Sequence, residues 1–199
     1  MSTPLVLACH WICRLCWCHI LFVMFSVLGL GLFGVCPATV ACCNMLRRYL
    51  NGAQTVTIKM MWTEYKTEFV RANKVGLLFA FVGFVFFFYY SYGINVESTA
   101  LNIVGYFCIV MFLLTAFVGY SCLAMLSIYD ATNFKGILQN GAVMLRDVYT
   151  VAGTIAAIIT TYLVEKFIPV VGFFYGLAPV LYATIGIYWY KRAELKKIL

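Results

Sequence analysis

The chain has 199 residues, of which 64% are hydrophobic, 18% aromatic and 11% charged, and its formal net charge is +7. A soluble domain of this length cannot bury so much apolar surface, so the composition excludes a soluble globular protein and indicates a membrane protein. We expect an all-α fold: a polytopic membrane helix bundle of about five transmembrane helices with cytoplasmic amphipathic helices, forming a single integral membrane domain over residues 1–199.

Long uncharged runs mark the expected spans, because crossing about 30 Å of hydrocarbon takes roughly 20 residues. The five predicted spans lie near residues 15–36, 75–94, 101–128, 148–164 and 167–190. Arg14 sits within the approach to the first span, which favours a retained helix over a cleaved signal peptide. In the last span, Gly172 and Gly176 have the GxxxG spacing that permits close helix contact, and Pro179 predicts a kink.

The distribution of basic residues predicts the orientation, because short loops rich in Lys and Arg stay in the cytoplasm. With five spans, the loops 47–74 and 130–147 and the carboxyl-terminal tail share one side and hold twelve of the fourteen Lys and Arg residues. Arg14 and Lys166 fall on the other side. We therefore predict a multi-pass protein of the cell membrane with its N-terminus outside and its C-terminus in the cytoplasm. A basic rim facing anionic lipid accounts for the net charge, so we expect no nucleic-acid partner.

Both predicted cytoplasmic loops contain apolar residues at helical spacing, which indicates amphipathic helices at the membrane interface. In the first loop they are Ile58, Met61, Trp62, Tyr65 and Phe69. In the second they are Phe134, Ile137, Leu138, Gly141 and Leu145, after the candidate N-cap Asn133. Such helices could seal the inner rim of the bundle or dock a partner. The candidate contact residues are Trp62, Tyr65, Lys66, Phe69, Arg71, Phe134, Lys135 and Leu138.

Intramembrane catalysis or ion coupling should leave ionisable groups inside the spans. The carboxylates fall at predicted span ends instead: Glu97, Asp130, Asp147 and Glu165. We expect the polar residues within or near the spans to bond backbone carbonyls or neighbouring helices. These residues are Asn102, Thr115, Ser121, Thr150, Thr154, Thr160 and Thr161. The chain also lacks a phosphate-binding loop, an HExxH metal helix and a GxSxG elbow. We therefore predict no enzyme, no catalytic residue, no cofactor and no metal.

The nine cysteines include a cluster of Cys9, Cys13, Cys16 and Cys18, next to two histidines. A helix would place Cys9, Cys13 and Cys16 on one stripe, and this crowding fits a tetrahedral zinc site badly. We expect free thiols that pack as small apolar groups. Metal binding, redox activity and acylation remain open.

Four short motifs are distinctive when taken together. They are GLFGVCPAT at residues 31–39, RRY at 47–49, WxxYKxxFxxANxxG at 62–76 and YDxxxFKxILxNGA at 129–142. In sequence and order they resemble the YesL family of bacterial integral membrane proteins. The Cys-rich start departs from that pattern, and so does Glu68, where relatives more often carry Asn.

The resemblance implies an accessory role, because YesL-like proteins tend to accompany carbohydrate-importing ABC systems. We expect a non-enzymatic accessory integral membrane protein whose partners are the lipid bilayer and either ABC sugar-permease subunits or further copies of itself. The alternative is a small solute transporter or channel acting on its own, which should show a polar cavity lined by Asn102 and the threonines.

Overall fold

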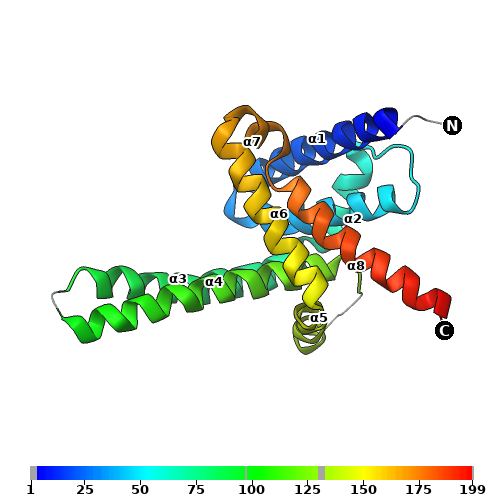
Figure 1. Cartoon of the computed structure of the whole chain (residues 1–199). Coiled ribbons are helices and arrows are strands. Elements are labelled where there is room, and N and C mark those ends of the chain that lie inside the picture. Colours follow the sequence, from blue (N-terminus) through cyan, green and yellow to red (C-terminus); the bar gives the residue numbers. More distant parts are fainter. Residues whose placement is uncertain (1–3, 97, 130–132, 199) are drawn as a thin grey trace.

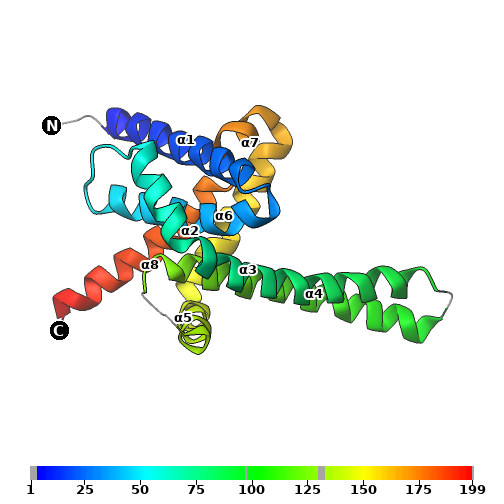
Figure 2. The same cartoon turned by 180° about the vertical axis from the view of Figure 1, so that it is seen from behind.

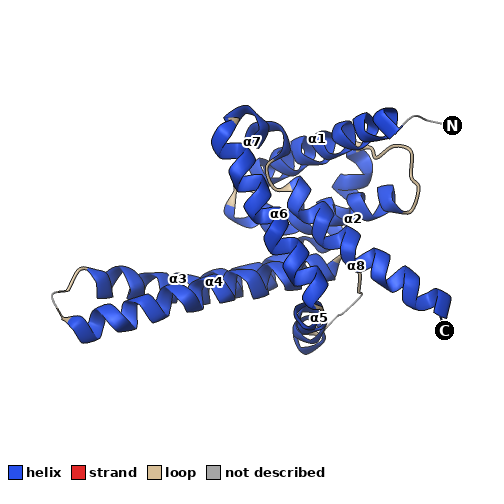
Figure 3. Ribbon diagram, in the orientation of Figure 1, coloured by secondary structure: helices blue, strands red, loops and turns tan. Residues whose placement is uncertain are grey.

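A computed structural model describes residues 4–96, 98–129 and 133–198, and this part of the chain is helical throughout apart from turns and short loops (Figure 3). Glu97 and Asp130, which the sequence placed at span ends, lie outside the described residues. The helices are α1 (Pro4–Leu28), α2 (Leu32–Leu50), α3 (Ile58–Ile94), α4 (Thr99–Leu126), α5 (Phe134–Arg146), α6 (Val148–Phe167), α7 (Pro169–Tyr175) and α8 (Ala178–Ile198). The predicted all-α class is confirmed.

Helix α2 is the centre of the core. Twelve of its nineteen residues are buried, among them Pro37, Ala38 and Thr39. It lies between α1 on one side and α3 and α8 on the other (Figures 1 and 2). Because α2 contacts protein along most of its length, it does not need the apolar surface of a lipid-facing helix.

The predicted first span, 15–36, is wrong in its boundaries. The helix stops at Leu28 and the backbone turns at Leu30 and Gly31, whose φ values are 58° and 72°. A Cβ at Gly29 would lie 2.3 Å from the Cα of Gly34, so only glycine lets the two helices approach this closely. The Pro-Ala-Thr sequence therefore lies inside a second helix and does not end the first span.

Helices α1, α2 and α3 run antiparallel in succession. The guanidinium of Arg14 in α1 lies 5.0 Å from the ring centroid of Tyr49 at the end of α2. The indole of Trp17 donates to the carbonyl of Val56 in the loop that follows, at 3.0 Å. The predicted separation of Arg14 from the basic segment 47–74 is thus not observed, because this part of α1 lies beside that segment.

Helices α3 and α4 form a long antiparallel pair that projects from the rest of the molecule (Figures 1 and 2). The predicted spans 75–94 and 101–128 correspond to this pair. The predicted interfacial helix at 57–73 is helical, but it is not separate: α3 continues through it for 37 residues. At 1.5 Å per residue this is about 55 Å, longer than the hydrocarbon core, so α3 extends beyond the membrane.

The remaining helices complete the predicted pattern. α5 confirms the second amphipathic helix, and α6 matches the predicted span 148–164 with three more residues at its end. The last predicted span, 167–190, is broken into α7 and α8, which are bent by 57°. The break lies at Gly176, whose φ is 32°, whereas Pro179 falls in the first turn of α8.

Among the described residues, four helices are long and apolar enough to cross a membrane, or five if the bent pair α7 and α8 counts as one span. They are α1, α3, α4 and α6. Large apolar side chains are exposed along all four, as lipid-facing helices require. The chain is a multi-pass membrane protein with about the predicted number of spans.

Candidate contact surface

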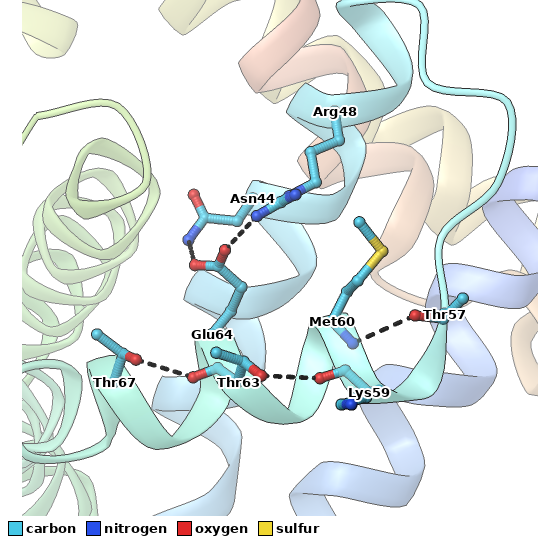
Figure 4. A network of polar contacts seen from close by, with 8 residues as sticks. All are labelled: Asn44, Arg48, Thr57, Lys59, Met60, Thr63, Glu64 and Thr67. Carbon is cyan, nitrogen blue, oxygen red and sulfur yellow. Dashed lines mark hydrogen bonds and ion pairs between the residues drawn. The ribbon is translucent and has the colours of Figure 1, made fainter.

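The eight candidate contact residues lie on two helices. Five are on the first half of α3 and three on the first half of α5. Helix α3 begins where the hydroxyl of Thr57 accepts a hydrogen bond from the backbone N–H of Met60 at 3.3 Å (Figure 4). Asn133 occupies the corresponding position before α5, but its side chain makes no capping hydrogen bond.

The aromatic residues of α3 turn largely toward α1. The ring centroid of Phe25 lies 5.8 Å from that of Trp62 and 5.3 Å from that of Tyr65. The ring centroid of Phe69 lies 5.6 Å from that of Tyr65. Tyr65 is only 4% exposed, so it belongs to the core and offers no contact surface. Phe69 is half-buried, whereas Trp62 keeps 41% of its surface exposed, with the ammonium of Lys66 4.8 Å from its ring centroid.

A polar contact that the sequence did not indicate joins α3 to α2. The carboxylate of Glu64 accepts hydrogen bonds from Arg48 at 2.6 Å and from the amide of Asn44 at 3.0 Å (Figure 4). Glu64 lies between the predicted aromatic positions and carries no signal of its own. Its partners become visible only when α2 folds back along α3.

Arg71 has a structural role that the sequence did not predict. Its guanidinium lies 3.3 Å from the carboxylate of Glu68 and donates to the backbone carbonyl of Tyr129 at 3.1 Å. It therefore ties α3 to the chain that leaves α4. Because Arg71 is half-buried and already bonded, only part of its charge is available to a partner.

The structure brings the two predicted amphipathic helices together at a groove of about 400 Å³, which we call the α3–α5 groove. It is lined by Thr67, Val70, Arg71, Lys74, Val75, Phe134 and Ile137. On α5, the buried face consists of Ile137, Gly141 and Met144. Phe134, which lines the groove, is exposed, and so are Lys135 and Leu138, which do not line it. A Cβ at Gly141 would lie 2.5 Å from the sulfur of Cys122, so α5 packs closely on α4.

Three of the hydroxyl groups bond backbone carbonyls as predicted, whereas Thr150 donates to the carboxylate of Asp147. Thr115 and Ser121 donate to the backbone carbonyls four residues earlier, at 2.7 and 2.8 Å. Thr154 does the same and also lies 3.1 Å from the hydroxyl oxygen of Thr184, which in turn lies 2.8 Å from that of Tyr120. These contacts join α4, α6 and α8 without forming an open polar site.

The cysteine cluster lies on α1, as the helical spacing required. Cys9 and Cys13 are exposed, Cys16 is half-buried and Cys18 is buried. The thiol of Cys42 donates to the backbone carbonyl of Cys18 at 3.9 Å. Over the described ranges no three His, Cys, Asp or Glu side chains gather to hold a metal ion.

Glu165 was expected at a span end, but the structure gives it a more specific place. Together with Thr161 it lines a cavity of about 760 Å³ between α4, α6 and the break that separates α7 from α8. The sequence could not indicate this cavity, because its walls come from three distant segments. Asn102 lies instead near the start of α4, in the projecting pair.

Comparison with known proteins identifies one family match and several relatives, each covering less than half of the chain. Residues 15–90 match the family described as "Protein of unknown function, DUF624". The chain is 39% identical over 80 residues to the Bacillus subtilis (strain 168) protein described as "Uncharacterized protein YteU", covering 40% of this chain and 36% of YteU. It is 33% identical over 81 residues to YesV of the same strain, covering 40% of this chain and 39% of YesV.

YesL itself is 30% identical over 71 residues, which are 35% of this chain and 34% of YesL, and it too is described as uncharacterised in B. subtilis (strain 168). The matched segment thus spans little more than a third of the length of these relatives. No solved structure matches the chain. The predicted resemblance to the YesL family is confirmed.

Proposed function

We propose that this YesL-like protein is a non-enzymatic accessory membrane protein that binds a partner through its α3–α5 groove. The partner is a permease subunit of a carbohydrate ABC import system. The partner class rests on the resemblance to the YesL family, and the contact surface rests on the groove. The observation that supports the proposed contact surface is that two segments far apart in the sequence, both predicted as amphipathic helices, line the α3–α5 groove together.

The lining of the groove suggests what it would bind. Val70, Phe134 and Ile137 form apolar walls, while Lys74 and the half-buried guanidinium of Arg71 add positive charge. Leu138 and Lys135 extend the same character along α5. An amphipathic segment with apolar and acidic side chains complements such a surface, because it fills the apolar walls and pairs the cations.

Site-directed photo-crosslinking in native membranes tests the proposal. A photoreactive residue at Leu138, beside the groove, should form a covalent adduct with an ABC sugar-permease subunit. The same residue at Ile103, exposed on the projecting pair, serves as the matched control and should not. The accessory role would be refuted if the protein formed no adduct with the photoreactive residue at either position and was also recovered only as a monomer after mild detergent extraction. Adducts between two copies from Leu138 would identify self-association instead.

A small transporter or channel is the second candidate, and the cavity beside Glu165 is the observation that favours it. This cavity contains Thr161, one of the threonines expected for such a path, although Asn102 lies elsewhere. Solute flux into liposomes that contain the purified protein alone would support this function. Flux equal to that of empty liposomes would leave the accessory role as the better account.

The proposal includes a location in the cell membrane and an orientation. We keep the C-terminus in the cytoplasm, since the basic segments 47–74 and 130–147 remain its strongest indication. We propose that the N-terminus lies on the same side, which differs from the sequence-based expectation. The support is that Arg14 and Trp17 contact Tyr49 and Val56 at the basic segment.

A further inference from the structure

The cavity between α4, α6 and the α7–α8 break combines a mainly apolar and aromatic lining with one carboxyl group. Apolar and aromatic residues form most of its surface, including Phe117, Tyr120 and Tyr162. Among the described residues that line the cavity, Glu165 has the only carboxyl group, and Lys166, the next residue, is exposed and does not line it. A volume of about 760 Å³ is within the range of cavities that hold small organic ligands.

Among the described residues, no Lys or Arg side chain pairs with the carboxyl group of Glu165. Within the described part of the chain it forms no ion pair, whereas the carboxylates of Glu64, Glu68 and Asp147 each contact a basic side chain. A Cβ at Gly172 would lie 3.2 Å from the carboxyl carbon of Glu165, so α7 packs directly against this group. An unpaired carboxylate in a membrane-spanning helix is costly and is commonly retained for function.

A second buried polar side chain, which has an atom without a hydrogen-bond partner, lies beside the same helix break. His19 of α1 is only 7% exposed, and its Nδ1 atom is buried without a hydrogen-bond partner in the described structure. Its ring reaches the backbone of Gly176, where a Cβ would lie 2.3 Å from the ring carbon Cε1. Glu165 is close enough to His19 to act on it electrostatically. Irregular backbone at membrane depth is tolerated where it is enclosed by protein or borders a cavity.

We propose that this cavity binds a lipophilic organic cation, with Glu165 as the counter-charge and the rings of Tyr120, Tyr162 and Phe117 around the apolar body of the ligand. A cation supplies the charge that Glu165 lacks, and aromatic rings attract cations through their faces. An anion would face an unpaired carboxylate at close range, which disfavours it. This site is distinct from the α3–α5 groove and does not depend on a partner protein.

The test uses two probes of the same shape and opposite charge. Tetraphenylphosphonium and tetraphenylborate are equilibrated with the purified full-length protein in nanodiscs of phosphatidylcholine, with empty nanodiscs as the reference for partition into lipid. The phosphonium should bind saturably, with one ion per chain, and tetraphenylborate should not. E165Q should weaken binding of the phosphonium by about tenfold or more, since it removes the counter-charge. E64Q makes the same chemical change outside the cavity and should bind as the wild type does.

G172A provides an independent variant, because its methyl group would crowd the Glu165 carboxyl without changing any charge. It should weaken phosphonium binding while the protein still elutes as a single species in gel filtration. Because Glu165 forms no hydrogen bond or ion pair among the described residues, E165Q should keep the wild-type melting temperature, which separates lost binding from lost folding. Equal phosphonium affinity in E165Q and wild type, or equal binding of the two ions, would overturn the proposal.

Discussion

At the scale of single residues, Asp147 is the clearest electrostatic contact between α6 and α8. Its carboxylate accepts hydrogen bonds from the ammonium of Lys191 and from the hydroxyl of Thr150, the latter at 2.6 Å. Its side chain is only 11% exposed. Burial raises the pKa of Asp147, but the hydrogen bonds from Lys191 and Thr150 outweigh that effect and hold the pKa below its usual value.

D147N should therefore destabilise the protein at neutral pH. We expect a loss of about 1 kcal/mol, because Lys191 is partly exposed to solvent, and a fall of about 2–4 °C in the melting temperature. The pKa is lower in the folded state than in the unfolded state. The stabilisation is therefore complete above the unfolded value of about 4 and is lost as the pH falls through the folded value.

The measurement is thermal unfolding of wild type and D147N in detergent from pH 7 down to pH 3. The difference between the two melting temperatures should be constant near neutral pH and shrink below about pH 4. E165Q is the matched control, because it neutralises a carboxylate without a partner. A difference for D147N that does not change with pH would show that the loss is not electrostatic.

At the scale of helices, the projecting pair depends on the close approach of Gly93 and Gly105. A Cβ at Gly93 would lie 2.7 Å from the backbone carbonyl oxygen of Leu101 and 3.0 Å from the Cα of Gly105. Both are backbone atoms, so α3 and α4 must separate to admit even one methyl group. G93A should therefore destabilise the pair by about 1–3 kcal/mol.

Thermal unfolding of G93A beside G186A tests this packing. A Cβ at Gly186 would meet nothing within 4 Å, so G186A should be neutral or slightly stabilising in its helix. Equal melting temperatures for the two variants would show that the ends of α3 and α4 are not in tight contact.

The same scale shows how far the sequence predicts this fold. Uncharged runs of sufficient length identified the spans in α3, α4 and α6, because the thickness of the bilayer determines their length. The turn at Leu30 and Gly31 was missed because the residues on both sides remain apolar and uncharged. The separate interfacial helix expected before Lys74 is not observed, because a change from polar to apolar residues does not end a helix.

The candidate sites, too, were predicted only in part. Helical spacing identified the amphipathic faces of α3 and α5, and the second one is confirmed as a helix with one buried face. Spacing could not tell that Tyr65 points into the core, because Phe25, its neighbour, comes from another helix. The cavity at Glu165 was missed because its walls come from α4, α6 and the α7–α8 break, which only the tertiary fold brings together.

At the scale of the whole molecule, the course of α1, α2 and α3 determines how the chain is oriented. Helix α2 returns along α1, and α3 returns along α2: Cys36 lies against Gly76, and Arg48 pairs with Glu64. The first half of α1 and the start of α3 therefore share one end of the molecule. Arg14 joins the basic residues there, which leaves Lys166 as the one basic residue expected on the opposite side.

Both termini should consequently face the cytoplasm. A short tag that completes a cytoplasmic split fluorescent protein should give fluorescence when placed at the N-terminus or at the C-terminus. The same tag inserted after Asn95, which is exposed at the end of α3, should give none, because the projecting pair carries it across the membrane. Fluorescence from the C-terminal tag without fluorescence from the N-terminal tag would restore the orientation expected from five spans. It would also mean that α2 does not return the chain across the bilayer, even though it lies antiparallel to α1.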